Sequence, residues 1–381
     1  ADFTFNPSFS CRGEYDDNIN FDNDNEISDW LGIFIPRLET SWQDERFDLR
    51  GSAEAEIRRY LDEGQYDDEY QRYHLNGSYQ ATERLSLEAG AGYIRDSTLD
   101  SELEETGIVE DLYLRERWDV DGGLRFRLGE RVFSSLNYGY GNTSYEGPGN
   151  VDYDTHSLVG SLSWLLKNQR DQVFLQPSYY HYESDVSQVD NYGLSLGWNR
   201  TLSEKLTLNC YLGLRYTDSE YYYKTYVPVF DPGSGSFYWQ LASMTISESD
   251  FGGTADISLS GKTEVLSYKL AYNRDLSYTS TGSPIDRDRL TASLNWNMSP
   301  RLASGISAGL YFSKSNDDYS TEDSNYFYIH PHLSYRLFEN HRLELHYQYA
   351  RTRDNTLSDN DAYDRSRVWL ALVFRFPKLL D

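Results

Sequence analysis

A short turn signature returns eight times along the chain, roughly every forty residues, and separates long runs of alternating apolar and polar residues. The spacing accommodates a strand of ~10–14 residues, a loop and a returning strand. Eight tight turns at one end imply nine longer loops at the other, and therefore about eighteen antiparallel strands. Each copy has polar residues, a basic residue and then the apolar residue that opens a strand: Glu45-Arg46-Phe47, Glu83-Arg84-Leu85, Glu130-Arg131-Val132, Gln169-Arg170 before Val173, Glu204-Lys205-Leu206, Lys262-Thr263-Glu264-Val265, Pro300-Arg301-Leu302 and His341-Arg342-Leu343.

The runs between the turns alternate strictly, as in residues 290–298, where Leu, Ala, Leu, Trp and Met are separated by Thr, Ser, Asn and Asn. Alternation alone also fits a soluble sandwich with a buried apolar face. Strands of about ten residues or more, with no Pro/Gly/Ser linker between them, favour one closed barrel instead. We therefore predict an all-β chain, a single domain over residues 1–381. It forms a closed antiparallel transmembrane β-barrel of about 18 strands (roughly 16–20), with short periplasmic turns and long acidic extracellular loops.

The composition is compatible with such a barrel. No apolar run is long enough for a membrane-spanning helix, and the mean hydropathy of −0.70 reflects polar loops and a polar inner face. Aromatic residues make up 15% of the chain, which interfacial girdles would explain. The formal charge of −26 argues against a nucleic-acid partner, since phosphate binding requires clustered Lys and Arg.

Charged residues in mid-strand must face the lumen, because Arg at the lipid midplane costs about 2–4 kcal/mol. Opposed rings of charge could select among ions and polar solutes, or they could pair across strands and hold the barrel's shape. Inward tyrosines could stack on sugar rings or could simply pack. The predicted pore-lining residues are Arg50, Glu54, Glu56, Arg115, Arg117, Asp119, Asp121, Arg125, Arg127, Tyr211, Arg215, Lys269 and Tyr311.

The segment from Tyr221 to Thr245 is the longest loop expected, and it is rich in aromatic residues. Aromatic rings left in water forfeit their burial energy, so we predict that this loop folds into or over the lumen as a gate. The predicted gating residues are Tyr226, Phe230, Phe237, Tyr238 and Trp239.

The remaining long loops are acidic, including the one from Leu99 to Asp111, and are interpreted as solvated outer loops. Calcium binding is an alternative, although no EF-hand spacing is present. An enzyme is a less favoured alternative. His330-Pro331-His332 places two imidazoles on one strand face, but the sequence identifies no third metal ligand. We predict no catalytic residues, no metal and no cofactor.

The opening Gly13-Glu14-Tyr15-Asp16-Asp17-Asn18-Ile19 resembles the Y-x-D-N start of the first hairpin in the putative beta-barrel porin 2 family, whose members include barrels of exopolysaccharide and exosortase loci. The resemblance implies a monomeric barrel in the bacterial outer membrane whose substrate is often a secreted polysaccharide. Near the other end, the spacing of Trp369, Ala371, Phe374 and Phe376 resembles the signal read by the barrel assembly machinery.

These features together predict an outer-membrane channel or porin, either a passive or an export pore, for polar solutes or a secreted polysaccharide. The expected partners are outer-membrane lipid and lipopolysaccharide, the barrel assembly machinery, and a periplasmic export partner or a cytochrome. The alternative function is a barrel sheath enclosing a partner protein such as a multihaem cytochrome. The chain itself has no Cys-x-x-Cys-His for attaching haem.

Overall fold

The computed structural model describes residues 2–108, 112–147, 149–233, 235–315, 323–354 and 362–376. The described residues form eighteen strands, each antiparallel to the next along the chain, with one α-helix and one short 3-10 helix, Gly64–Tyr66, between them. The elements are β1 (Asp2–Asp16), β2 (Asp29–Gln43), β3 (Phe47–Tyr60), β4 (Asp68–Gln80), β5 (Leu85–Ser97), α1 (Thr98–Thr106), β6 (Leu114–Arg127), β7 (Val132–Tyr145), β8 (Tyr153–Leu165), β9 (Asp171–Ser184), β10 (Ser187–Ser203), β11 (Leu206–Asp231), β12 (Ser236–Lys262), β13 (Leu266–Tyr278), β14 (Pro284–Asn297), β15 (Leu302–Ser315), β16 (Asp323–Phe338), β17 (His341–Asp354) and β18 (Ala362–Arg375).

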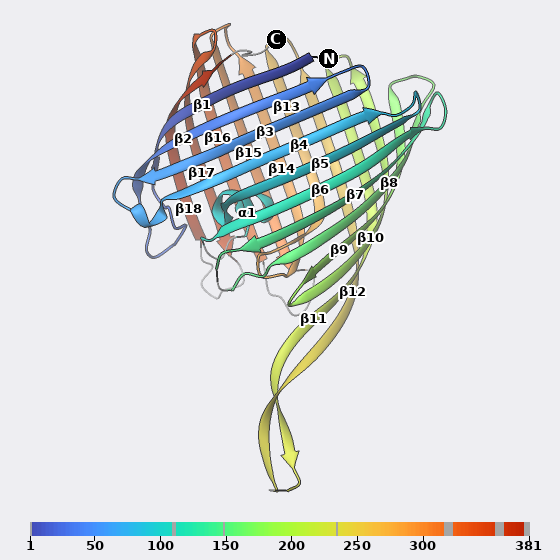
Figure 1. Ribbon diagram of the computed structural model, residues 1–381, viewed down its shortest axis with the longest axis vertical. Coiled ribbons are helices and arrows are strands. Elements are labelled where there is room, and N and C mark those ends of the chain that lie inside the picture. Colours follow the sequence, from blue (N-terminus) through green and yellow to red (C-terminus); the bar gives the residue numbers. More distant parts are fainter. Residues whose placement is uncertain are drawn as a thin grey trace.

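The sheet closes on itself because β18 pairs with β1, in a register that runs from Ser8 opposite Arg375 to Asp16 opposite Arg367. Closure leaves no sheet edge along the wall, which is the condition for β-strands to cross a bilayer. The predicted fold, a closed antiparallel barrel of 18 strands, is confirmed (Figure 1). None of the helices in the described ranges is both long and apolar enough to span a membrane.

The eight turn signatures lie at the eight tight connections, from β2–β3 through β16–β17, at the end of the barrel where both chain ends lie (Figure 1). Backbone hydrogen bonds close these turns, as from the Asp44 amide to the Phe47 carbonyl at 2.7 Å and from Thr263 to Leu266 at 2.7 Å. The recurring turn signature therefore predicted the number of hairpins correctly. The connections at the opposite end vary in length, with two residues between β9 and β10 and twelve between β1 and β2, so the expectation of long loops there holds for some connections and not for others.

Alternate residues of each strand face opposite sides of the wall. In β6, Trp118 and Val120 point outward and are each 54% exposed, because nothing but lipid would cover them. The neighbouring Arg115 and Arg117 point inward and contact α1. The outward face is thus a belt of apolar side chains, and the inward face carries the charges.

The segment from Tyr221 to Thr245 is not a loop and does not cover the lumen. β11 loses its partner β10 beyond Tyr221, and β12 pairs with β13 only from Ala255 onward. Beyond these points β11 and β12 continue to pair with each other up to Asp231 opposite Ser236, as a two-stranded ribbon that extends far from the barrel (Figure 1).

The gating prediction is therefore wrong for Tyr226, Phe230, Phe237, Tyr238 and Trp239. All five lie on the ribbon with exposed side chains, Phe237 at 70% and Trp239 at 69%. The physical reason is the backbone ladder. Continuous pairing past the rim satisfies the backbone groups on the facing edges of the two strands, and this ladder holds the strand pair extended instead of letting it fold back over the mouth.

The two faces of β6 provide a test of the barrel. Val120 lies near the middle of the strand on the outward face, so Val120→Arg should lower the free energy of unfolding in lipid vesicles by about 2–4 kcal/mol. The control is Asp121→Arg, which places the same side chain in the lumen one residue later and should cost less than about 1 kcal/mol. Urea titrations of both variants measure the difference. Equal costs would contradict the assignment of the two faces.

Candidate functional site: a helix fastened inside the lumen

The lumen contains α1, a nine-residue helix between β5 and β6. Its first turn is capped by Ser97, whose hydroxyl accepts a hydrogen bond from the Asp100 amide at 3.3 Å. Its end is set by Gly107, which has a φ of +77° and donates its amide to the Leu103 carbonyl. A side chain at Gly107 would also come within 3.1 Å of Tyr326 Cβ, so the helix can end against this wall only with a glycine.

With about 100° of rotation per residue, the sequence of α1 gives the helix three distinct sides. Leu99 and Leu103 form the first side, Asp100 stands alone on the second, and Glu102 and Glu105 share the third. Each side meets a different part of the barrel wall, so the position of the helix is determined from three directions.

The apolar side packs on the wall opposite to the strands that flank α1. Leu99 and Leu103 are buried in a cluster with Tyr311 of β15, Tyr326 of β16 and Ala350 of β17. The end of the helix is tied to the same strands. The hydroxyls of Ser324 and Thr352 donate to the Gly107 carbonyl at 3.2 Å each, and the Ser313 hydroxyl donates to the Thr106 carbonyl. The helix therefore crosses the lumen from one wall to the other.

Asp100 binds two arginines of the barrel. Its carboxylate lies 2.7 Å from Arg58 of β3 and 3.0 Å from Arg367 of β18, and all three side chains are nearly buried. Burial alone would raise the pKa of Asp100, but the guanidinium groups of Arg58 and Arg367 lower it below the ordinary range. Removing one member of such a group leaves uncompensated buried charge, so this contact should dominate the docking of α1.

The third side of α1 faces β6 through β13. Glu105 lies 3.0 Å from both Arg115 and Arg117 of β6. Glu102 accepts a hydrogen bond on Oε1 from the Ser280 amide at 2.7 Å, while its Oε2 is buried and has no hydrogen-bond partner among the described residues. Burial raises the pKa of Glu102 to about 7, although Arg115 and the Ser280 amide act in the opposite direction.

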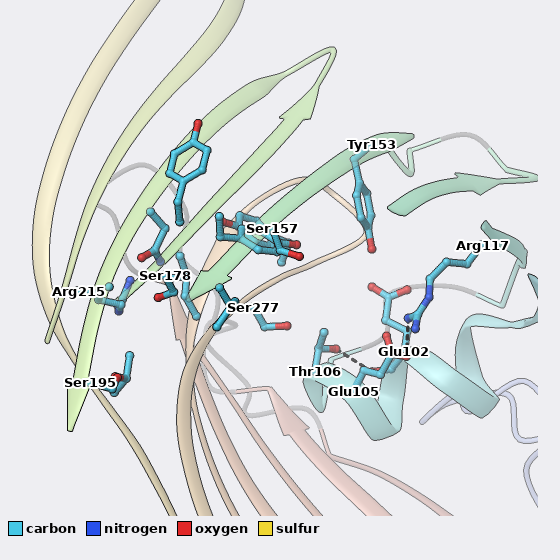
Figure 2. Close-up of a pocket in the computed structure, with 18 of the residues that line it drawn as sticks. Glu102, Glu105, Thr106, Arg117, Tyr153, Ser157, Ser178, Ser195, Arg215 and Ser277 are labelled. Carbon is cyan, nitrogen blue, oxygen red and sulfur yellow. Dashed lines mark hydrogen bonds and ion pairs between the residues drawn. The ribbon is translucent and has the colours of Figure 1, made fainter. Parts of the chain in front are cut away.

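Two cavities flank the helix. One has a volume of about 400 Å³ and lies between Glu102, Glu105 and Thr106 on one side and the wall of β6–β13 on the other (Figure 2). The second, of about 450 Å³, lies between Leu99, Asp100 and the side of the barrel that carries Arg58 and Arg365. The helix thus divides the mouth of the lumen into two smaller spaces.

The thirteen predicted pore-lining residues all lie on the inward face, as the alternation along β3, β6, β11, β13 and β15 requires. The structure brings Arg115, Arg117 and Tyr311 together around α1. Arg50, Glu54 and the remaining residues line the wall away from the helix or beside it. Their contribution to selectivity stays a prediction.

Most of these charges are paired. Glu54 lies 3.3 Å from Arg37 and 3.2 Å from Arg72, Arg125 lies 3.4 Å from Glu88, and Arg215 contacts Asp286. The interpretation in which lumenal charges pair across strands is therefore supported by the contacts. A free transverse field of opposed charges would require these pairs to be open.

The expectation of a solvated acidic loop from Leu99 to Asp111 is wrong for α1, which is a helix inside the lumen. Three signals were present: Ser97 three residues before Asp100, leucines at i and i+4, and Gly107 directly after the last turn. The acidic segments 316–322 and 355–361 lie outside the described residues.

The two histidines of the His330-Pro331-His332 pair face the lumen. His330 contacts His346 of β17 at 3.0 Å, and the ring of His346 stacks on Trp369 of β18 at 4.8 Å. Within the described ranges, no three His, Cys, Asp or Glu side chains are arranged to hold a metal ion.

Comparison with known proteins gives one family match. The model of the family "Putative beta-barrel porin 2" matches residues 1–113, from the first strand through α1. The chain thus resembles this family of outer-membrane porins, and with its closed barrel and apolar belt it is a bacterial outer-membrane protein. No curated protein matches the chain in sequence.

Solved structures with similar folds include OpdK of Pseudomonas aeruginosa with vanillate, at 12% identity and a TM-score of 0.47, covering 98% of each chain. OccK2 (OpdF) of the same organism has 12% identity and a TM-score of 0.49, with 100% of this chain and 98% of that chain covered. A BenF-like porin of Pseudomonas fluorescens has 11% identity and a TM-score of 0.49, with 98% and 99% covered. The architecture described above rests on the strand pairing of this chain itself.

The pairing of Asp100 can be tested by hydrogen exchange. Asp100→Asn leaves Arg58 and Arg367 without their shared carboxylate, at an expected cost of about 3 kcal/mol or more to the docking of α1. Amide protection at Gly107 should fall by about a hundredfold. The control is Glu69→Gln, which removes an exposed pair with Arg59 and should change protection little. Unchanged protection in Asp100→Asn would contradict the anchoring role.

A second test uses pH. A carboxyl whose pKa rises from 4.5 to about 7 on docking stabilises the docked helix fully only below its free pKa, and the advantage is lost as pH rises through 7. Ionised Glu102 should therefore weaken docking by about 3 kcal/mol. Protection at Gly107, corrected for intrinsic exchange, should be lower at pH 8.5 than at pH 5.5. Glu102→Gln should remove this pH dependence, and a wild-type profile without one would contradict the prediction.

Proposed function

We propose that this barrel is a passive channel for small polar solutes and that α1 sets the width of its lumen. The observation that carries the proposal is the helix itself, which is fastened to opposite walls by Asp100, by Glu105 and by the Leu99–Leu103 side. Constrictions of this kind limit the size of what passes, while water fills the remaining space in a barrel of this strand number.

The cavities support one particular path. The 400 Å³ cavity beside α1 and a cavity of about 470 Å³ nearer the tight turns share Ser195 and Thr254 in their linings. The second cavity also contains Tyr211 and Asp256. The shared residues place the two cavities next to each other along β9–β13, and the proposed path runs through both. We place the tight turns in the periplasm and the longer connections outside, as in barrels of this class.

The sheath function predicted as an alternative would need the helix to move. An enclosed cytochrome is far larger than the cavities of about 400 and 450 Å³ beside α1, so a sheath requires undocking of a helix that is held from three directions. A secreted polysaccharide would have to thread the narrowed lumen as a single extended chain. The docked helix therefore favours a channel over a sheath.

Single-channel recording in planar bilayers tests the proposal. The wild-type protein should give steady openings, and replacing residues 99–107 with a Gly/Ser linker should raise the conductance several-fold. The matched control shortens the exposed ribbon by replacing residues 225–242 with an Asn-Gly turn, which leaves the lumen untouched and should leave conductance unchanged. Silence in the bilayer would overturn the passive channel in favour of a sheath or a plugged export gate. Equal conductance without α1 would overturn its role in restriction.

A further inference from the structure

The cavity between α1 and the β6–β13 wall has the features of a binding site as well as of a passage. Its volume of about 400 Å³ lies within the range of small-molecule sites, about 300–1,000 Å³. It lies where α1 narrows the lumen, so a solute on the proposed path must pass through it. Figure 2 shows Glu102 and Glu105 facing it from the helix, and Ser178, Ser195 and Arg215 on the wall across from them.

Hydroxyl groups dominate the lining. Serines and threonines from five different strands and from α1 face the space, and tyrosines add hydroxyls and ring faces. Hydroxyls both donate and accept, so they match a ligand that presents many hydroxyls of its own. The residues concerned are Thr106, Ser157, Ser178, Ser195, Thr254, Ser277, Tyr145, Tyr153, Tyr180 and Tyr278.

The tyrosines are ordered by stacking. The ring of Tyr278 stacks on Tyr180 at a centroid distance of 5.7 Å and on Tyr182 at 4.1 Å, and Tyr153 contacts Tyr182 at 5.0 Å. A stack of this kind fixes the rings before any ligand arrives, which reduces the entropy lost on binding. Flat aromatic surfaces beside hydroxyls suit the C–H face and the rim of a sugar ring.

The arginines around the cavity are already paired. Arg115 and Arg117 pair with Glu105, and Arg215 pairs with Asp286 and donates to Thr217. An anionic solute would therefore find its counter-charge engaged and would have to lose its hydration without replacement. An uncharged solute meets no such cost.

Glu102 supplies the polar atom that needs a ligand. Glu102 lines the cavity and is only 3% exposed, its Oε1 accepts the Ser280 amide, and its Oε2 has no hydrogen-bond partner among the described residues. An unsatisfied buried acceptor costs about 1–3 kcal/mol, and a ligand hydroxyl placed against it would recover that loss.

We propose that this cavity is a binding subsite for an uncharged polyhydroxylated solute, of the size of a mono- or disaccharide, with Glu102 Oε2 accepting a ligand hydroxyl and Tyr153, Tyr180 and Tyr278 forming the wall for its ring. The inference rests on the proposed channel function and specifies its substrate class.

The test uses maltose as the probe, added to the wild-type protein during single-channel recording. Maltose in the tens of millimolar should interrupt the current reversibly, in proportion to its concentration, as a solute that dwells in the constriction would. Ser157→Phe fills the cavity from the wall without touching α1 and should weaken this block by at least about tenfold. The matched control is Ser161→Phe, which adds the same ring on the inward face of β8 outside the cavity lining and should leave the block unchanged.

The role of Glu102 needs its own variant. Glu102→Gln should keep the contact with Ser280 but lose a charge-assisted hydrogen bond, so the apparent affinity for maltose at pH 8 should fall by about tenfold. Glu88→Gln, which changes the same charge in the lumen away from the cavity, should leave affinity unaltered.

The outcomes separate the two proposals. A silent bilayer overturns the channel, whereas ordinary conduction that maltose does not interrupt overturns the subsite alone. Interruption by gluconate or glucosamine but not by maltose shows that the site takes charged solutes, and it overturns the assignment to an uncharged class. Block that Ser157→Phe and Ser161→Phe weaken equally reflects the width of the lumen and also overturns the subsite.

Discussion

The structure depends on the absence of water from the bilayer core, which obliges every backbone amide and carbonyl there to find a partner within the protein. The pairing of β18 with β1 meets this condition by removing the last two strand edges. Once the sheet is closed, the pleat alone decides which side chains meet lipid and which meet the lumen. An outward apolar belt and an inward polar surface are therefore two consequences of one constraint.

Charges excluded from the lipid face gather in the lumen, where they neutralise one another. Glu54 between Arg37 and Arg72 and Arg215 with Asp286 are examples on the wall. Arg58 and Arg367 would be left buried without enough counter-charge, and Asp100 of α1 supplies it. The helix is thus bound to the wall by charged side chains that point into the lumen because the membrane excludes them from the outer face of the strands.

The barrel could be predicted from the sequence, but the helix inside its lumen could not, and particular residues show why. Strand number and facing depend on local patterns, the recurring turns and the two-residue period, so the inward positions of residues such as Arg115 and Tyr211 could be predicted. The placement of α1 depends on contacts with Ser280, Tyr311 and Arg367, which are remote in sequence and leave no local pattern. Its nine residues are too short and too acidic for helical periodicity to stand out.

The prediction of a gating loop at the ribbon was wrong because local residues were given too much weight. Pro228, Pro232 and Gly233 suggested a loop, but the pairing of β11 with β12 continues through Pro228 opposite Trp239. Proline is tolerated there because beyond Tyr221 that strand has no partner on its other side and Pro228 stands on an edge. Aromatic residues in such a segment signal strand propensity as readily as burial.

The stability of the barrel wall and the narrowing of the lumen therefore depend on different interactions. The barrel is held by a backbone ladder that α1 does not enter, while α1 is held by side chains of β3, β6 and β15–β18. Loss of the helix contacts should widen the lumen and leave the wall intact, because no ladder hydrogen bond is broken. Among the described side chains of the helix, only Glu102 keeps a buried atom without a hydrogen-bond partner, and Glu102 lines the cavity on the proposed path. The proposed subsite therefore uses the polar contact of α1 that the described wall leaves incomplete.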